Sequence, residues 1–236
     1  MSEIDLSVVI PAYNEEARLG ATLASVCTHL STTPLSWELI VVDDGSADGT
    51  LAVAAAAAGA EPRMRVIRWP ANRGKGHAVR RGVLVSRGRQ VLFTDADLAT
   101  PIEEFGRLRA ALSQGADAAI GSRARPGSRI LVRQHPVRHL LGTLGNRLIR
   151  ALALPEVADT QCGFKLFDGN KARVVFGRAR LDGWAFDVEI LRAFARRGWP
   201  VREVPVRWSH RPGSKLRAHH YLLTLSGLCL LLCERR

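Results

Sequence analysis

The sequence contains few cysteines and no long apolar run, and both scarcities restrict the class of protein. Only four of its 236 residues are cysteine, and their spacing suits neither a zinc site nor a disulfide framework. No apolar run reaches the roughly 18–20 residues that a membrane-spanning helix needs. A strand is expected almost from the first residue, which leaves no room for a signal peptide. These features predict a cytoplasmic protein without membrane spans.

Acidic residues are scarce relative to basic ones. The chain has 34 Lys and Arg against 22 Asp and Glu, giving a formal net charge of +12 and an isoelectric point near 10.8. This excess suits a partner rich in phosphate, such as nucleic acid, a nucleotide or an anionic membrane surface. Only four of the basic residues are lysine. Because codon bias alone can produce an arginine excess, the charge does not choose among these partners.

Several nucleotide-binding and nucleic-acid-binding signatures are missing. No Gly-x-Gly-x-x-Gly follows the first expected strand, and no phosphate-loop Lys-Ser/Thr sequence occurs. These absences argue against a dinucleotide oxidoreductase and a nucleoside triphosphatase. No helix-turn-helix, zinc or RNP pattern is recognisable, and acids at strand ends would repel a phosphate backbone. We therefore expect no nucleic-acid partner.

The sequence does show a regular alternation of apolar strands and amphipathic helices. Buried strands are predicted at 6–10, 37–42, 64–69, 91–94 and 116–120, with helices between them. This spacing predicts an α/β fold: a doubly wound, mostly parallel sheet flanked by helices in a single domain. Beyond residue 120 the alternation loosens, with helices expected at 136–152 and 182–197 and a strand at 201–208. We assign residues 1–217 to the domain and 218–236 to an apolar C-terminal helix.

Two carboxylates, Asp95 and Asp97, follow the strand predicted at 91–94. Parallel strands place their carboxyl ends at the edge of the sheet where α/β folds bind ligands. Side chains at i and i+2 of a strand end can face the same side, so this pair can share one divalent cation. A strand followed by a simple Asp helix cap would give the same pattern.

Turn-forming or glycine-rich loops also follow the first three predicted strands. They are the segments 11–14, 43–45 and 72–76. Each alone could be a turn, but the right-handed crossover rule gathers all of them around one crevice. That crevice combines carboxylates for a base, a ribose and a metal with Arg73, Lys75 and Arg123 for phosphate.

Taken in order, these loops resemble the motifs of family 2 glycosyltransferases of the GT-A fold. The matching segments are Ser7–Glu16, Val41–Thr50, Asn72–Gly76 and Thr94–Thr100. Asp159–Phe167 and Trp184–Glu189 narrow the resemblance to the polyprenyl-phosphate branch. Within it, the string Asp-Thr-Gln-Cys-Gly-Phe-Lys at 159–165 is most similar to dolichyl-phosphate β-glucosyltransferases. The resemblance covers residues 6–215, nearly the whole chain.

The resemblance implies an inverting, metal-dependent enzyme that moves a hexose from a nucleotide-diphosphosugar, foremost glucose from UDP-glucose, to a polyprenyl or dolichyl phosphate. It assigns Mg²⁺ or Mn²⁺ to Asp95 and Asp97. It assigns donor-nucleotide binding to residues at the strand ends: Pro11, Ala12, Tyr13, Glu15, Asp43, Asp44, Lys75, Asp95, Ala96 and Arg123. Among these, Asp43 would contact the base edge and Arg123 would support the phosphates.

Acid–base chemistry bears on the acceptor. A sugar hydroxyl needs a positioned general base, whereas a lipid monophosphate, with a second pKa of roughly 6, is largely deprotonated at pH 7. Such a phosphate needs a cationic pocket instead. The candidates for this acceptor site are Gln161, Cys162, Gly163, Lys165, Arg211 and Lys215. Catalytic roles are expected for Asp97, Lys165, Asp187 and Lys215.

Other enzymes of related fold remain open. A family 2 enzyme acting on a sugar hydroxyl in polysaccharide or O-antigen synthesis is one, and a GDP-mannose-using polyprenyl-phosphate mannosyltransferase is another. Mannosyl-transferring relatives often carry a metal-binding glutamine where this chain has Ala99, which weakens the second. A nucleotidyltransferase would need a Gly-rich, Arg-containing signature after the first strand, and none is present.

Two stretches predict contact with a membrane surface, although the relatives' membrane anchors are not seen in this sequence. Between Asp117 and Glu156 there are seven arginines and no acid, and 221–233 is almost wholly apolar but too short to span a bilayer. A solvated loop and a packed C-terminal helix would give the same pattern. We predict peripheral attachment at the cytoplasmic face of a membrane.

Overall fold

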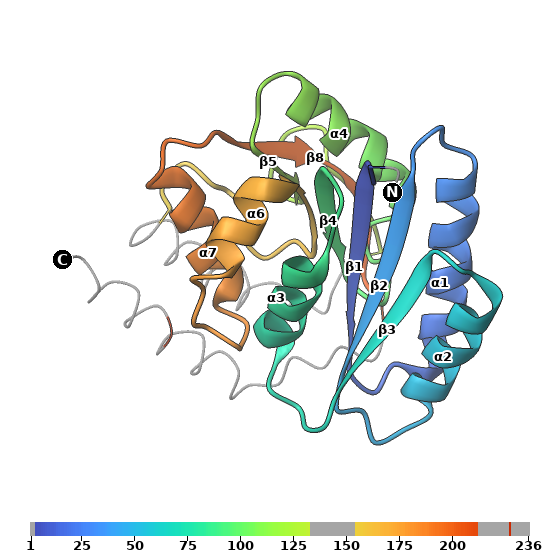
Figure 1. Cartoon of the computed structure of the whole chain (residues 1–236). Coiled ribbons are helices and arrows are strands. Elements are labelled where there is room, and N and C mark those ends of the chain that lie inside the picture. Colours follow the sequence, from blue (N-terminus) through green and yellow to red (C-terminus); the bar gives the residue numbers. More distant parts are fainter. Residues whose placement is uncertain (1–2, 133–153, 212–226, 228–236) are drawn as a thin grey trace.

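A seven-stranded sheet forms the centre of the protein, which we describe from a computed structural model over residues 3–132, 154–211 and 227 (Figure 1). Its strand order is β3-β2-β1-β4-β7-β5-β8. β7 runs antiparallel to both neighbours and the other strands run parallel to one another, which confirms the predicted mostly parallel sheet. The strands are β1 (Leu6–Ala12), β2 (Trp37–Asp44), β3 (Met64–Trp69), β4 (Gln90–Thr94), β5 (Ala118–Ser122), β7 (Phe164–Asp168) and β8 (Val201–Pro205).

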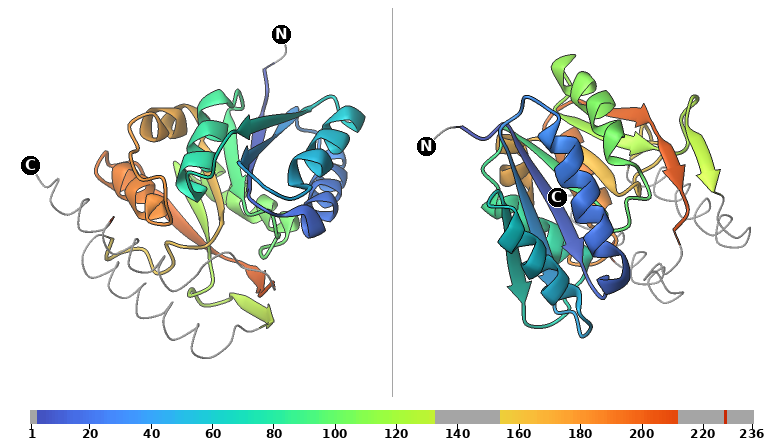
Figure 2. Two further views of the ribbon diagram at one scale, coloured as in Figure 1. Left: turned by 90° about the horizontal axis from the view of Figure 1, so that it is seen from below. Right: turned by 90° about the vertical axis from the view of Figure 1, so that its right-hand side faces the viewer.

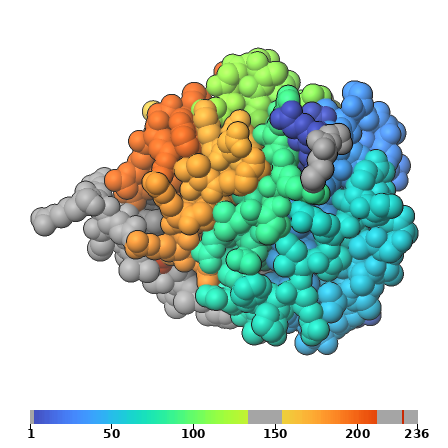
Figure 3. All heavy atoms as spheres, in the orientation of Figure 1, coloured from blue at the N-terminus to red at the C-terminus, as the bar shows by residue number. Residues whose placement is uncertain are grey.

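Helices cover both faces of the sheet (Figures 1 and 2). One face carries α1 (Glu16–Ser31), α2 (Thr50–Ala60) and α4 (Phe105–Ser113), the last preceded by a short 3₁₀ helix, η1 (Ile102–Glu104). The other carries α3 (Lys75–Val85), α6 (Gly169–Phe176) and α7 (Phe186–Ala195). In the space-filling view, atoms of this second layer lie at the front of the molecule, and the blue and cyan atoms of the N-terminal part remain visible beside them (Figure 3).

The first strand shows how the two layers share the sheet. Leu6, Val8 and Ile10 pack toward α1, α2 and α4, whereas Val9 packs toward α3. All four side chains are fully buried. A strand buried on both faces reads as a continuous apolar run, which is why these strands could be predicted from composition alone.

The second half of the chain departs from the prediction. β7 and α6 were not predicted, and β7 is entered from a loop at the carboxyl edge of its neighbours, so it runs against them. The strand expected at 201–208 is two strands, β8 and β9 (Arg207–Ser209). β9 leaves the main sheet and pairs in parallel with β6 (Arg129–Val132). The helix expected at 182–197 forms only from Phe186 to Ala195.

Two predicted helices lie mainly outside the described residues. They are the one at 136–152 and the apolar one at 218–236, of which only Gly227 is described. Gly227 is helical and buried, and a Cβ atom on it would lie 2.9 Å from the Cβ of Ala185. Within the described part of the chain, no helix is long and apolar enough to cross a membrane.

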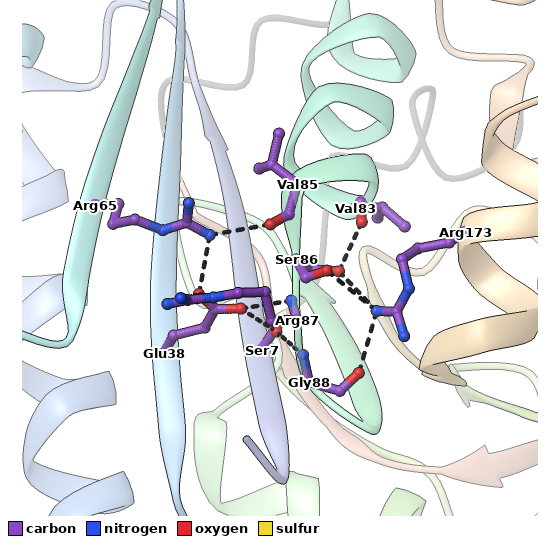
Figure 4. A network of polar contacts seen from close by, with 9 residues as sticks. All are labelled: Ser7, Glu38, Arg65, Val83, Val85, Ser86, Arg87, Gly88 and Arg173. Atoms are coloured by element: carbon purple, nitrogen blue, oxygen red, sulfur yellow. Dashed lines mark hydrogen bonds and ion pairs between the residues drawn. The ribbon is translucent and has the colours of Figure 1, made fainter. Parts of the chain in front are cut away.

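A buried carboxylate, Glu38, ties strand β2 to its neighbours at the amino edge of the sheet (Figure 4). Its Oε1 accepts hydrogen bonds from Ser7 Oγ (2.7 Å) and from the backbone N–H of Arg87 (2.7 Å), and its Oε2 accepts one from Arg65 (2.9 Å). Burial alone would raise the pKa of Glu38, but these bonds and the two arginine charges hold it below its usual value. The ionised carboxylate therefore stabilises the fold.

We expect Glu38→Gln to lower the free energy of unfolding at pH 7 by about 1–3 kcal/mol, because an amide nitrogen would face the arginine donors. Since the folded pKa is depressed, this stabilisation is present above the unfolded value of about 4.3 and is lost as pH falls through the folded pKa. Urea denaturation at pH 7 and below pH ~4 would measure it. The exposed Glu103→Gln is the matched control. Equal losses in the two variants at pH 7 would contradict the role of Glu38.

Candidate active site

The two predicted metal-binding acids lie in a tight turn directly after β4. The backbone N–H of Asp95 donates to the carbonyl of Gly163 (3.0 Å), and Asp97 Oδ1 accepts from the N–H of Ala99 (3.0 Å). Between them and Ala99, Leu98 adopts a φ of 43°, in the left-handed region that non-glycine residues rarely enter. Such strain persists only where its surroundings enforce it, and it often marks functional sites.

A lysine lies against the first of these acids. Lys75, at the start of α3, places its Nζ 2.7 Å from Asp95 Oδ1 and over the rings of Phe93 (5.2 Å) and Trp184 (4.9 Å). Burial alone would lower the pKa of Lys75, but the charges of Asp95 and Asp187 more than offset this and raise it. The ammonium group is therefore a fixed positive charge at the carboxyl edge, as predicted from the loop at 72–76.

A buried ion pair lies behind this lysine. Lys165 Nζ lies 2.5 Å from Asp187 Oδ1 and 2.5 Å from the carbonyl oxygen of Cys162, and both charged side chains are only 2% exposed. Asp187 also acts on Lys75, so the charges alternate from Asp95 through Lys75 and Asp187 to Lys165. Lys165 was expected to bind the acceptor phosphate directly. In this structure its two partners and its burial keep the ammonium group from solvent, and its role toward the acceptor stays a prediction.

The loop before β7 reaches the acids because β7 is antiparallel. A Cβ atom on Gly163 would lie 1.9 Å from Asp95 Oδ2, so only glycine allows this approach. Cys162 is 1% exposed, and burial raises the pKa of its thiol to about 11, so the thiol is neutral and packed in the core. Gln161 has an Nε2 atom with no hydrogen-bond partner within the described part of the structure.

An arginine–carboxylate pair holds the same loop from the other side. Arg123 donates from Nε to Asp159 Oδ2 (2.7 Å) and from Nη2 to Oδ1 (2.8 Å). The guanidinium keeps the pKa of Asp159 low against the opposing effect of burial. Arg123 was expected to support the donor's phosphates. In this structure the guanidinium group is bonded to Asp159, so Arg123 fixes the loop that carries Gly163.

The acids at the end of β2 have different surroundings. Asp43 is 1% exposed; its Oδ1 accepts from the N–H of Ser46 (3.2 Å), and its Oδ2 is buried with no partner among the described residues. A ligand N–H would satisfy that oxygen, as the predicted contact with a base edge requires. Asp44 Oδ2 accepts from the N–H groups of Arg73 (3.1 Å) and Gly74 (2.7 Å). It therefore positions the loop that carries Lys75.

The segment after β1 supplies one site residue that the prediction missed. This residue is Arg18, which donates hydrogen bonds to both carboxylate oxygens of Glu15, a residue expected to bind the donor nucleotide. The charge of Arg18 in turn interacts with Asp97 and Asp95. In the sequence, Glu15 and Arg18 are three residues apart at the start of a helix. An acid and a base at this spacing can form an ion pair, so the spacing could have predicted this contact.

The remaining predicted residues are spread more widely. Pro11 and Ala12 are the last residues of β1, and Tyr13 follows half-buried. The carbonyl of the buried Ala96 accepts from Thr22 Oγ1 (2.7 Å), which secures the turn between the two acids. Arg211 is exposed after β9, and Lys215 lies outside the described residues.

The pair Asp95 and Asp97 fits a divalent-cation site completed by substrate. Burial and the charge of Asp95 raise the pKa of Asp97, so a bound cation would relieve an electrostatic cost that the protein itself sets up. Across residues 3–132 and 154–211, no cluster of three or more His, Cys, Asp or Glu could hold a metal. Mg²⁺ is commonly bound by one or two carboxylates together with substrate phosphates, which matches this donor set.

Comparisons with known proteins identify the family of this chain. The family model described as "Glycosyl transferase family 2" matches residues 7–176. The dolichyl-phosphate beta-glucosyltransferase of Drosophila melanogaster is 41% identical over 227 residues, which cover 90% of this chain and 69% of that protein. The enzyme of the same name from Homo sapiens is 37% identical over 225 residues, covering 89% and 69%.

A solved structure shares the fold. Glucosyl-3-phosphoglycerate synthase from Mycobacterium tuberculosis, in complex with Mn²⁺, UDP-glucose and phosphoglyceric acid, superposes with a TM-score of 0.71. The superposition covers 96% of this chain and 79% of that one at 22% sequence identity. At that identity the likeness extends to the fold alone.

Proposed function

Because this chain belongs to glycosyltransferase family 2 and has the GT-A fold, we propose that it is an inverting glucosyltransferase. Its donor is UDP-glucose, its acceptor is a dolichyl or other polyprenyl phosphate, and the reaction depends on Mg²⁺ or Mn²⁺. The observation that carries this proposal is the likeness to dolichyl-phosphate beta-glucosyltransferases over about nine-tenths of the chain, at 41% identity to the Drosophila protein.

The residues at the carboxyl edge suit the leaving group of this reaction. As the anomeric C–O bond breaks, negative charge develops on the departing nucleoside diphosphate. A divalent cation bound by Asp95 and Asp97 would neutralise part of that charge. Lys75 adds a positive charge already fixed beside Asp95, which costs no reorganisation when the charge develops. Asp43 Oδ2, which has no partner among the described residues, can accept the ring N–H of a uracil base.

The carboxylates around the site favour a phosphate acceptor over a hydroxyl. Asp187 is paired with Lys165, and both oxygens of Glu189 accept backbone N–H groups, from Arg180 (2.8 Å) and Leu181 (2.9 Å). In this structure both carboxylates are thus engaged by other groups, whereas a sugar hydroxyl would require a general base able to take its proton. A phosphate monoester oxygen, already charged at neutral pH, attacks the anomeric carbon without one.

The lipid chain of the acceptor requires that the reaction take place at a membrane. A polyprenyl phosphate lies in a bilayer with its phosphate at the interface, so this protein meets its acceptor at a membrane surface. We place it there as a peripheral protein, at the cytoplasmic face where nucleotide-sugars are available.

We expect the full chain to transfer glucose from UDP-glucose to dolichyl phosphate in detergent, and to lose this activity in excess EDTA. Added Mn²⁺ should restore it. Thin-layer chromatography would show the product, and NMR of its anomeric proton would show the β-linkage that inversion produces. GDP-mannose as donor and a free sugar as acceptor are the controls. Faster transfer with either control, or full activity in EDTA, would contradict the proposal.

A further inference from the structure

A two-stranded ribbon projects from the body of the protein. It consists of β6 (Arg129–Val132) and β9 (Arg207–Ser209), which pair with each other and not with the main sheet. In both views of Figure 2 the yellow-green strand β6 lies at the periphery, outside β9. The pairing shifts register between Ile130 and Val132, which leaves Leu131 as the extra residue of a bulge.

The outer strand of this ribbon is apolar and wholly exposed. Ile130, Leu131 and Val132 are 39%, 60% and 51% exposed, and no residue of β6 is buried. Only two other large hydrophobic residues of the described chain are exposed, Leu84 on α3 and Val174 on α6. Three consecutive exposed aliphatic residues on one strand are unusual, because soluble proteins protect such edges with charge, proline or a covering element.

Basic residues flank the apolar strand. Arg129 begins β6 and Arg211 follows β9, and among the described residues neither forms an ion pair. Two acids near the ribbon are already paired, Glu203 with Arg125 and Glu104 with Arg107 and Arg207. The exposed Glu103 also acts on Arg207, which lies on β9 and not on β6. The ribbon therefore presents aliphatic side chains beside uncompensated positive charge.

One hydrogen bond attaches the ribbon to the turn that carries Asp95 and Asp97. The N–H of Ser209 in β9 donates to the carbonyl of Ala99 (2.8 Å), two residues beyond Asp97. The N–H of Arg129 donates to the carbonyl of Val206 (3.1 Å), and Arg123 lies over the ring of Trp208 in β9 at 5.4 Å. Whatever the ribbon binds is thus held at the edge of the sheet where transfer takes place.

We propose that the β6–β9 ribbon inserts its apolar edge into an anionic lipid bilayer and so docks the active site against the membrane that holds the acceptor. This inference rests on the proposed function and adds to it the part of the protein that makes the contact. Aliphatic side chains enter the interface and the arginines bind lipid phosphates, the combination that holds peripheral proteins at membranes.

A bilayer fits the ribbon better than a protein partner does. All four residues of β6 are exposed, and aliphatic side chains that enter a lipid interface need no complementary protein surface to pack against. The unpaired positive charge matches the negative surface of anionic lipids within a Debye length. A protein partner would need matching acids and would give no preference for anionic vesicles.

Leu131→Asp tests this directly, with Val174→Asp as the matched control. Both replace an exposed aliphatic residue with an acid, so neither should unfold the protein, which circular dichroism would verify. We expect the unchanged full chain to sediment with phosphatidylcholine–phosphatidylglycerol vesicles. Leu131→Asp should weaken this partition by about tenfold or more. Val174→Asp should leave it unchanged, and Arg129→Ser should reduce the preference for anionic over neutral vesicles.

Equal sedimentation of the Leu131→Asp and Val174→Asp variants would overturn the inference, and so would the absence of vesicle binding by the unchanged chain. UDP-glucose binding by calorimetry and transfer to a short-chain, water-soluble prenyl phosphate separate this result from the proposed function. If transfer is intact and vesicle binding does not depend on Leu131, only the inference about the ribbon is contradicted. If vesicle binding depends on Leu131 but no glucose is transferred, only the proposed function is contradicted.

Discussion

Replacing Asp97 with asparagine should reduce glucosyl transfer by on the order of 10²–10³-fold or more, because it removes one of two carboxylates that can hold the cation at the leaving diphosphate. The fold should not suffer. Burial and the charge of Asp95 raise the pKa of Asp97, so its ionised form costs stability at neutral pH, and the neutral amide removes that cost. We therefore expect Asp97→Asn to be at least as stable as the unchanged protein at pH 7.

Initial rates and urea denaturation of the same preparations would check both parts of this result. Asp117→Asn is the matched control, because Asp117 pairs with Lys171 away from the carboxyl edge and its variant should keep full activity. The raised pKa of Asp97 also predicts that protons compete with the metal. Binding of Mn²⁺, followed by electron paramagnetic resonance, should tighten as pH rises through that pKa. Retained transfer by Asp97→Asn, or Mn²⁺ binding as tight as that of the unchanged chain, would contradict the assignment.

The second large effect concerns the buried pair of Lys165 and Asp187. Asp187→Asn leaves the Lys165 ammonium group 2% exposed without its counter-charge, and breaking such a pair costs about 3–5 kcal/mol. Lys165→Met should cost a similar amount for the reverse reason. The double variant Lys165→Met with Asp187→Leu removes both charges and should recover most of the loss. Urea denaturation would give the free energy of unfolding of the unchanged protein, the two single variants and the double variant. If the loss in the double variant equalled the sum of the losses in the single variants, the pair would not be coupled.

The Asp187→Asn variant also distinguishes a phosphate acceptor from a hydroxyl acceptor. If the acceptor is a phosphate, Asp187→Asn should lower kcat by roughly tenfold or less, measured well below its unfolding temperature, because it disturbs only the position of Lys75. If the acceptor were a hydroxyl and Asp187 the general base, the loss would be on the order of 10²–10⁴-fold. The pH profile distinguishes these further, since only loss of a base removes an acidic limb of kcat. A near-dead Asp187→Asn enzyme with intact UDP-glucose binding would overturn the phosphate assignment.

Several features of this protein were determined locally and could be predicted without coordinates. The apolar runs of β1, β2 and β4 are buried on both faces, so their composition identifies them as strands of a parallel sheet. The acids Asp95 and Asp97 lie one and three residues beyond Thr94, and chain direction alone places them at the ligand-binding edge. The loop around Lys75 was placed beside them by the same reasoning.

The tertiary structure decided which of the polar groups are free to bind substrate. Lys165 lies in a motif that predicts an acceptor ligand, yet a carboxylate 22 residues away and the antiparallel direction of β7 bury it. Likewise, Arg123 forms an ion pair with Asp159, and Glu15 forms one with Arg18. Strand prediction depends on periodicity within a few residues, whereas the free energy of a charged group depends on which partners the fold brings within about 3 Å. That difference in range is why the sequence alone could place the edge of the sheet but could not tell a ligand of the substrate from a support of the site.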